Sequence, residues 1–266
     1  MFHISKIYLI ILVLFFGCTS TSMEFRSAKS AVRAEKNLNK GELWGLKALK
    51  IEKDNALIPY FLATEIYKHQ EKWEELAEML DEAMRRNPEQ KLEKPKYLID
   101  SKDITKENIK ESIAYTIKQG VNAYRQELWG NIFNQAVGIM KEDIQDNRVA
   151  EKLNFCIRVL PNRVETYAVM VEYYYSNNNL EKAKEYVDKG LNIEPSYQLY
   201  QFGTEILNRQ FMLSTTPENP SGDISFIQDA EKMCLQAIQL AKAKRKNTEQ
   251  LKTRLFLIYL DLGKNQ

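Results

Sequence analysis

Residues 164–195 place apolar side chains at helical spacing in two consecutive stretches. The apolar residues of the first stretch fall at i, i+3, i+4 and i+7, which is one face of an α-helix; they are Tyr167, Met170, Val171 and Tyr174. Those of the second stretch are Leu180, Ala183, Val187 and Leu191. Pro195 then ends the second helix, because proline lacks an N–H and clashes with the preceding turn. One short helix pair cannot bury both stripes, so the pattern predicts stacked neighbouring pairs.

The same internal spacing recurs in two other windows. One, shifted back by 34 residues, contains Phe133, Ala136, Val137, Met140, Val149, Leu153 and Pro161. The other contains Tyr60, Ala63, Thr64, Tyr67, Leu76, Leu80 and Pro88. This recurrence resembles the tetratricopeptide repeat (TPR), and the resemblance covers most of residues 25–262. It implies an all-α, TPR-type α-solenoid of antiparallel helix pairs, with about five to six repeats, that binds partner proteins.

The register of the repeats breaks once, in an insert over about residues 89–120. The polar first part of the insert, residues 89–104, predicts an irregular surface loop. Thr105 then offers an N-cap and Gly120 a C-terminal stop for a short helix. The apolar face of that helix would be Ile109, Ile113 and Ile117. A long helix is expected to follow, ending at about residue 141, so this repeat is irregular.

The two ends of the array depart from the regular centre. A turn-rich loop at about residues 213–223 separates the helices of the last repeat. A C-terminal capping helix is expected to cover the last apolar face of the array; its core side would be Leu251, Leu255, Ile258, Tyr259 and Leu262. At the other end, Gly41 and Gly45 each weaken a helix by about 1 kcal/mol relative to alanine, which predicts a frayed first repeat.

The N-terminus has the form of a signal peptide over residues 1–17. Its apolar run, residues 7–16, is too short to span a bilayer as a helix but fits the apolar region of a signal peptide. The sequence Leu14-Phe15-Phe16-Gly17-Cys18 resembles the lipobox of bacterial lipoproteins. The resemblance implies that Cys18 is lipidated and begins the mature chain. Ordinary cleaved secretion and an uncleaved anchor are the alternatives.

The same resemblance predicts where the mature chain is held. Residues 18–23 would form a tether, and residues 24–266 the TPR-like helical domain. Thr19 stands where many lipoproteins retained at the inner membrane have aspartate. This implies an outer-membrane lipoprotein that faces the periplasm.

Residue usage predicts neither catalysis nor nucleic-acid binding. The formal net charge is +2, which produces no basic field. Beyond His3 in the signal segment, His69 is the only histidine, and no metal-ligand spacing, phosphate-binding glycine loop or nucleophile motif occurs. We therefore expect no cofactor, no metal site and no enzymatic activity. Cys156 and Cys234 fall on packing stripes about two repeats apart, roughly 16 Å or more, so we expect buried free thiols and no disulfide.

The first helices of the repeats carry polar residues beside the packing stripe. In TPR-like arrays this side lines the concave groove that binds peptides. The partner-binding candidates are Asn131, Asn134, Lys141, Glu165, Glu172 and Tyr175. Asn134 and Lys141 resemble residues of TPR carboxylate clamps, whereas Glu165 and Glu172 would repel a C-terminal carboxylate. Tyr173 and Tyr175 are candidate aromatic residues at the rim. A merely solvated face, with partly buried tyrosines, is the alternative.

These features together predict a non-catalytic, lipid-anchored periplasmic TPR adaptor or scaffold that mediates protein–protein interactions in the cell envelope. Its partners would be a protein or peptide segment in the groove and the membrane through the N-terminal lipid, with no nucleic acid. The alternative is a small-solute-binding accessory lipoprotein of a transport system, which requires a closed apolar pocket. The sequence leaves the oligomeric state and the identity of the partner open.

Overall fold

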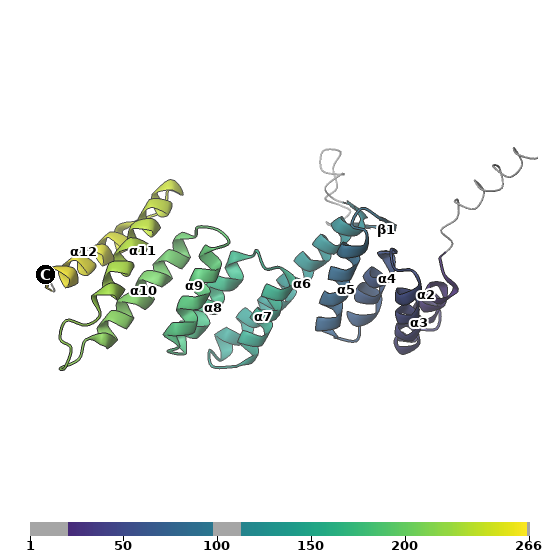
Figure 1. Ribbon diagram of the computed structural model, residues 1–266, viewed down its shortest axis with the longest axis horizontal. Helices are drawn as coiled ribbons and strands as arrows, with labels where there is room; N and C mark the ends of the chain where they lie inside the picture. The colour runs from purple at the N-terminus through teal and green to yellow at the C-terminus, as the bar shows by residue number, and fades with distance from the viewer. Residues whose placement is uncertain (1–20, 98–112, 265–266) are drawn as a thin grey trace, which may run out of the picture. The chain divides into compact units, whose positions relative to one another are not determined.

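The computed structural model describes residues 21–97 and 113–264, whose regular elements are helices apart from one two-stranded hairpin (Figure 1). The chain divides into two compact units, residues 1–124 and 125–266. Each unit is built from helix pairs packed side by side. The predicted all-α, TPR-type solenoid fold of antiparallel helix pairs is therefore confirmed. Within the described ranges, no helix combines the length and the apolar character that crossing a bilayer requires.

Unit 1 contains two helix pairs. Their elements are α2 (Met23–Arg33), α3 (Leu38–Ile51), α4 (Leu57–Phe61), the π-helix η1 (Leu62–Tyr67) that continues α4, and α5 (Trp73–Arg86). Phe25 of α2 meets Phe61 of α4 edge to face, with ring centroids 5.5 Å apart. This contact joins the first helices of the two pairs.

Gly41 and Gly45 of α3 are positions of close packing. A Cβ atom at Gly41 would lie 2.4 Å from Val32 Cγ2, and one at Gly45 would lie 2.6 Å from Leu62 Cδ2. Both glycines are buried, and α2 and α3 are complete helices. The prediction of a frayed first repeat is therefore wrong. Glycine has a low helix propensity, but here it lets α3 pack closely against α2 and η1, which a larger residue would prevent.

The insert contains a β-hairpin where a loop and a helix were expected. Strand β1 (Lys91–Tyr97) pairs antiparallel with β2 (Ile113–Thr116), and the register is irregular between Lys91 and Lys96. The predicted loop over residues 89–104 is wrong where β1 lies. The predicted helix is wrong at its end, because Ile113 belongs to β2. Thr105 and Ile109 lie outside the described residues.

Helix α6 (Ile117–Glu142) begins earlier than expected because Thr116 and Gln119 form a capping box. Gln119 N donates to Thr116 Oγ1 at 3.4 Å, and Gln119 Oε1 accepts from Thr116 N at 3.2 Å. Gly120 thus lies inside a helix and does not end one. A Cβ atom there would lie 2.9 Å from Tyr60 Oη, so glycine at this position allows a close approach to α4.

Unit 2 continues with helices that follow the predicted repeats. They are α7 (Arg148–Val159), α8 (Val164–Ser176), α9 (Leu180–Leu191), α10 (Tyr197–Ser214), α11 (Ile224–Ala243) and α12 (Glu249–Lys264). Figure 1 shows α8 beside α9, and α10 beside α11. The stripe residues Met170, Val171, Ala183 and Val187 are buried, as the pattern predicts.

The burial predicted for four further side chains of unit 2 can be compared with the structure. Cys156 and Cys234 are buried free thiols, as expected, and burial raises the pKa of Cys156 to about 12. Tyr173 is buried with Met170 and so does not belong to a groove rim. Tyr259 is 47% exposed, so its expected place on the core side of the closing helix is wrong.

Candidate partner-binding faces

The six predicted partner-binding residues lie on two first helices of unit 2. Helix α6 carries Asn131, Asn134 and Lys141, and α8 carries Glu165, Glu172 and Tyr175. All are exposed except Tyr175, which is half-buried. They lie beside buried stripe residues such as Ala136 and Val171. We call the side of unit 2 that carries these residues, with the adjoining first helix α10, the first-helix face.

Tyr175 connects α8 with α10. Its ring packs against the core cluster that contains Val171 and Ile206. The guanidinium carbon of Arg209 lies 5.4 Å from the centroid of the ring, a cation–π arrangement. Arg209 was missed in the sequence because the spacing within one helix does not reveal its contact with a neighbouring helix.

A second polar group joins α6 to the start of α8. Trp129 Nε1 donates to Thr166 Oγ1 at 2.8 Å, and the guanidinium carbon of Arg163 lies 5.0 Å from the Trp129 ring. Arg163 also donates to Gln126 and lies 3.9 Å from Glu165 Oε1. The charge of Glu165 is thus partly offset by a neighbouring cation.

The charges of the first-helix face are mixed along its length. Lys141 and Arg209 contribute positive charge, while Glu165 and Glu172 contribute negative charge from exposed positions on α8. A carboxylate clamp requires convergent cations without opposing carboxylates. The arrangement therefore fits an extended polar segment with its own mixed charges better than a free C-terminal carboxylate.

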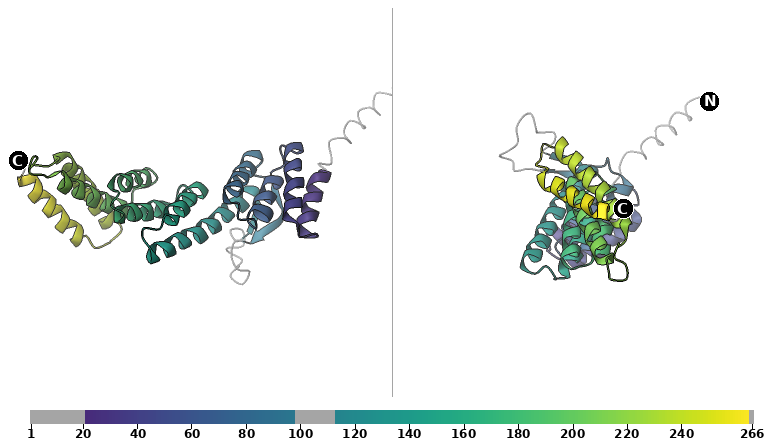
Figure 2. Two further views of the ribbon diagram at one scale, coloured as in Figure 1. Left: turned by 90° about the horizontal axis from the view of Figure 1, so that it is seen from below. Right: turned by 90° about the vertical axis from the view of Figure 1, so that its left-hand side faces the viewer.

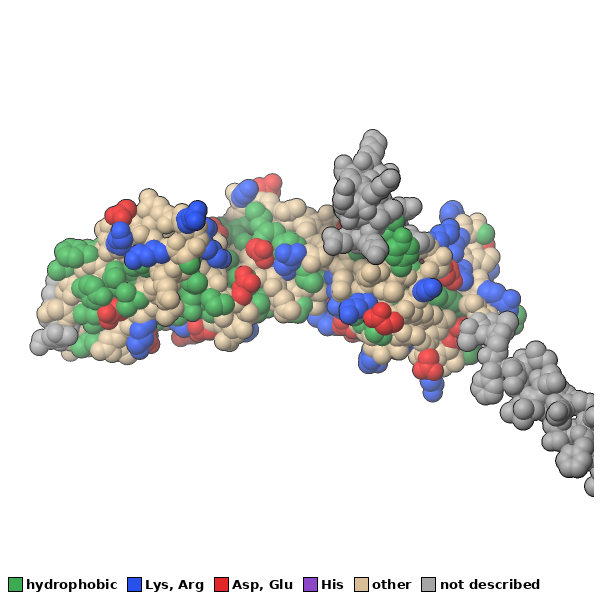
Figure 3. Space-filling view, turned by 90° about the horizontal axis from the view of Figure 1, so that it is seen from above, with side chains coloured by type: hydrophobic (Ala, Val, Ile, Leu, Met, Phe, Trp, Pro, Cys, Tyr) green, Lys and Arg blue, Asp and Glu red, His purple; other side chains and the backbone are tan. Residues whose placement is uncertain are grey.

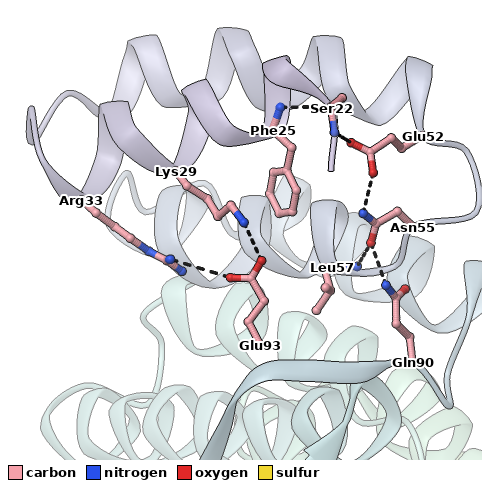
Figure 4. Close-up of polar contacts among 9 residues, drawn as sticks. All are labelled: Ser22, Phe25, Lys29, Arg33, Glu52, Asn55, Leu57, Gln90 and Glu93. Carbon is pink, nitrogen blue, oxygen red and sulfur yellow. Dashed lines mark hydrogen bonds and ion pairs between the residues drawn. The ribbon is translucent and has the colours of Figure 1, made fainter. Parts of the chain in front are cut away.

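In unit 1, the hairpin packs against α2 and the start of α4, which are first helices of their pairs (Figure 4). Glu93 of β1 accepts from Lys29 Nζ of α2 at 2.5 Å. Gln90 Oε1 accepts from Ala56 N at 2.7 Å, and Gln90 Nε2 donates to Asn55 Oδ1 at 2.9 Å. These contacts hold the chain leading into β1, and β1 itself, against α2 and the start of α4.

The hairpin leaves a small cavity beneath it. The cavity has a volume of about 110 Å³ and is lined by residues of α2, α4, η1 and β1, among them Phe25, Tyr60 and Leu92. Pockets that enclose small molecules are typically about 300 Å³ or more. The cavity therefore suits at most one side chain or a few water molecules.

Two other predictions concern chemistry outside these faces. Among residues 21–97 and 113–264, no group of three or more His, Cys, Asp and Glu side chains could hold a metal ion. His69 is exposed in the turn after η1. Cys18 lies outside the described residues, so its lipidation remains a prediction.

No family model and no curated protein matches the chain. Among solved structures, the chain is similar to the crystal structure of a MamA protein, at 13% identity and a TM-score of 0.34, over 85% of this chain and 93% of that one. It is also similar to YrrB, a TPR protein with an unusual peptide-binding site, at 11% identity and a TM-score of 0.28, over 87% and 97% of the two chains. At these TM-scores the similarities leave the function of the chain open.

Proposed function

We propose that the chain is a non-catalytic, lipid-anchored periplasmic TPR adaptor that holds an extended segment of an envelope protein on the first-helix face of unit 2. The observation that carries the proposal is the composition of this face. Exposed polar residues lie on α6 and α8, and α8 also carries the half-buried Tyr175, which pairs with Arg209 of α10. Tyrosine and arginine are enriched at binding hot spots, where a partly buried anchor is surrounded by polar contacts.

The start of the fold sets how far the helical domain would lie from a membrane, and it shortens the tether expected over residues 18–23, because α2 begins at Met23. Ser22 is the N-cap of α2, and its hydroxyl accepts from Phe25 N at 3.2 Å. A lipidated Cys18 would leave a tether of residues 18–21 before this cap, with a reach of roughly 15 Å. The helical domain would then stay near the membrane surface, where it could hold other envelope proteins.

The proposal is tested first by identifying what touches the first-helix face. A photo-crosslinking amino acid is placed in intact cells at position 134 of α6 or, as a control, at position 188 of α9. The face at position 134 should yield a discrete adduct whose partner is identified by mass spectrometry. Position 188 is 52% exposed yet lies on a second helix, so it should yield none.

The purified partner then allows the affinity to be measured. Changing Asn134 and Tyr175 to alanine should cost a few kcal/mol of binding free energy, as hot-spot truncations do. The matched change of Lys184 and Asp188 to alanine removes only an exposed i,i+4 ion pair, with Nζ and Oδ1 2.7 Å apart. It should alter stability by about 0.5 kcal/mol or less and leave affinity unchanged. Binding that survives the first pair of changes and fails with the second would move the site to the second helices.

The cavities give little support to the alternative of a small-solute-binding accessory lipoprotein. The cavity in unit 1 has a volume of only about 110 Å³ and is partly open to solvent. A larger depression in unit 2, lined by Asn177, Asn179 and Phe226, lies open at the surface. Solute binding requires a closed apolar pocket with a few convergent polar groups.

A further inference from the structure

Helix α12 is apolar on two opposite sides. On its inner side, Leu251 and Ile258 are buried, and Leu255 and Leu262 pack partly against the same core cluster. On its outer side Phe256 is exposed by 60%, Leu257 by 52% and Leu260 by 45%, and Tyr259, on the flank towards α11, is exposed by 47%. Figure 2 shows α12, in yellow, with no helix of unit 2 over its outer side.

The patch extends from α12 onto α11. Tyr259 lies beside Glu231 of α11, and burial together with this neighbouring carboxylate raises the pKa of the tyrosine. Leu235 stands one helical turn from Glu231 and is 43% exposed. Figure 3 shows hydrophobic side chains gathered over this end of unit 2. Terminal helices of repeat arrays normally present a polar outer face, and a contiguous exposed apolar patch marks an interaction site.

We propose that this patch binds a second copy of the chain, with the two α12 helices antiparallel and centred between Phe256 and Leu257. The spacing of the outer residues favours this pairing. Thr253, Phe256, Leu257 and Leu260 lie at i, i+3, i+4 and i+7, on one side of the helix. In the antiparallel pair, Phe256 lies opposite Leu257 of the copy, and Thr253 lies opposite Leu260. Each end of the pair therefore places a small side chain opposite a large one, which leaves room for the two helices to approach closely.

The area of the patch is consistent with a reversible dimer. The exposed parts of the five apolar side chains amount to on the order of 500 Å², so two copies that covered all of them would bury at most on the order of 1,000 Å², the lower limit for a specific interface. A two-fold pairing needs one patch that is complementary to itself, which the outer side of α12 provides. The dimer does not involve the first-helix face, so this inference stands independently of the proposed function.

Sedimentation velocity on the detergent-solubilised full chain, in density-matched buffer, tests the dimer. The wild-type chain should change from monomer to dimer as concentration rises. Changing Phe256 and Leu260 to glutamate should weaken association at least tenfold while the helical circular dichroism signal and its melting temperature are retained. The matched control changes Met212 and Leu213, which are 66% and 64% exposed on α10, to glutamate and should leave association unchanged. A wild-type chain that stays monomeric, or a dimer that survives the α12 changes, would overturn the proposal.

Cysteine cross-linking tests the antiparallel register. Leu257→Cys lies next to the centre and should form a disulfide-linked dimer under mild oxidation with copper phenanthroline. Thr253→Cys alone should not, because two copies of residue 253 would be offset by about 10 Å along the helices, beyond disulfide reach. A mixture of Thr253→Cys and Leu260→Cys chains should cross-link. The wild-type chain, with Cys18, Cys156 and Cys234, measures the background. Cross-linking by Thr253→Cys alone would show a parallel pair and overturn the register.

Discussion

Ala183 shows how a single small residue sets the distance between two helices of one repeat. It is fully buried in the cluster that contains Val187 and Leu199. Ala183→Leu should destabilise the chain by about 1–3 kcal/mol, because extra methylenes have no room in a packed core. The neighbouring Lys182→Leu should have little effect, since Lys182 is exposed and its Nζ lies 5.1 Å from the Tyr174 ring centroid. Urea unfolding of the two variants checks this, and equal losses would contradict the repeat register.

The helical pattern predicted which residues form the apolar stripe of each helix, but not that residues beside a stripe are buried as well. Tyr174 belongs to a stripe, yet its neighbour Tyr173 is the more deeply buried of the two, packed with Val149 and Leu153 of α7. A helix between two neighbouring pairs is covered from more than one direction, so residues beside its stripe are buried too. Spacing within one helix does not show where the next pair packs, which is why Tyr173 was placed at a rim.

At the scale of elements, the hairpin could not be predicted from short stretches of sequence. The capping box Thr116-x-x-Gln119 is present in the sequence and marks the start of α6. Ile113 and Ile117 are nevertheless spaced as on one face of a helix, and they also fit a strand that ends before a helix begins. Hydrophobic periodicity alone therefore does not distinguish these two structures. The deciding contacts are non-local, as in the bond from Lys29 to Glu93, 64 residues away. A short stretch of sequence does not show that the hairpin packs against α2.

Glu52 joins the start of α2 to the segment that leads into α4, and these contacts make the stability of unit 1 depend on pH. It accepts from Ser22 N at 2.8 Å and from Asn55 Nδ2 at 2.7 Å (Figure 4). Burial raises the pKa of Glu52, but the hydrogen bonds from Ser22 and Asn55 outweigh it, so the pKa lies below its ordinary value. The stability that Glu52 contributes is therefore present above the ordinary pKa of the carboxyl and is lost as pH falls through the lowered one.

The corresponding variant is Glu52→Gln. It should be less stable than the wild-type chain at pH 7, and the difference should shrink as the pH falls below about 4.3, the ordinary pKa of glutamate. Urea midpoints measured between pH 7 and pH 3 check this. Glu181→Gln, at an exposed position on α9, is the control and should follow the wild-type curve. A wild-type midpoint that falls no more steeply than that of Glu52→Gln would contradict the role of these hydrogen bonds.

At the scale of the whole molecule, the repeat pattern predicted the first helices but not which of their faces are open. The candidates from Asn131 to Tyr175 lie on α6 and α8 as expected. The hairpin over the first helices of unit 1 could not be foreseen, because a strand was not expected there. The outer residues of α12 are visible in the sequence as the run Leu255-Phe256-Leu257-Ile258-Tyr259-Leu260. A run that is apolar on every side of a helix does not reveal which side faces the core.

The proposed membrane attachment through Cys18 would determine where the first-helix face and the α12 patch operate. Acyl chains contribute about 0.8 kcal/mol per buried CH₂ group, so a multiply acylated cysteine would hold the helical domain on a membrane. Cys18→Ser removes the acceptor sulfur and should abolish incorporation of labelled palmitate. The chain should then leave the membrane fraction or accumulate as an uncleaved precursor. Thr21→Ala, three residues downstream, should leave both labelling and fractionation unchanged. If Cys18→Ser is processed and fractionates like the wild-type chain, the anchor is not a lipid on Cys18, and the adaptor would have to reach the envelope by another route.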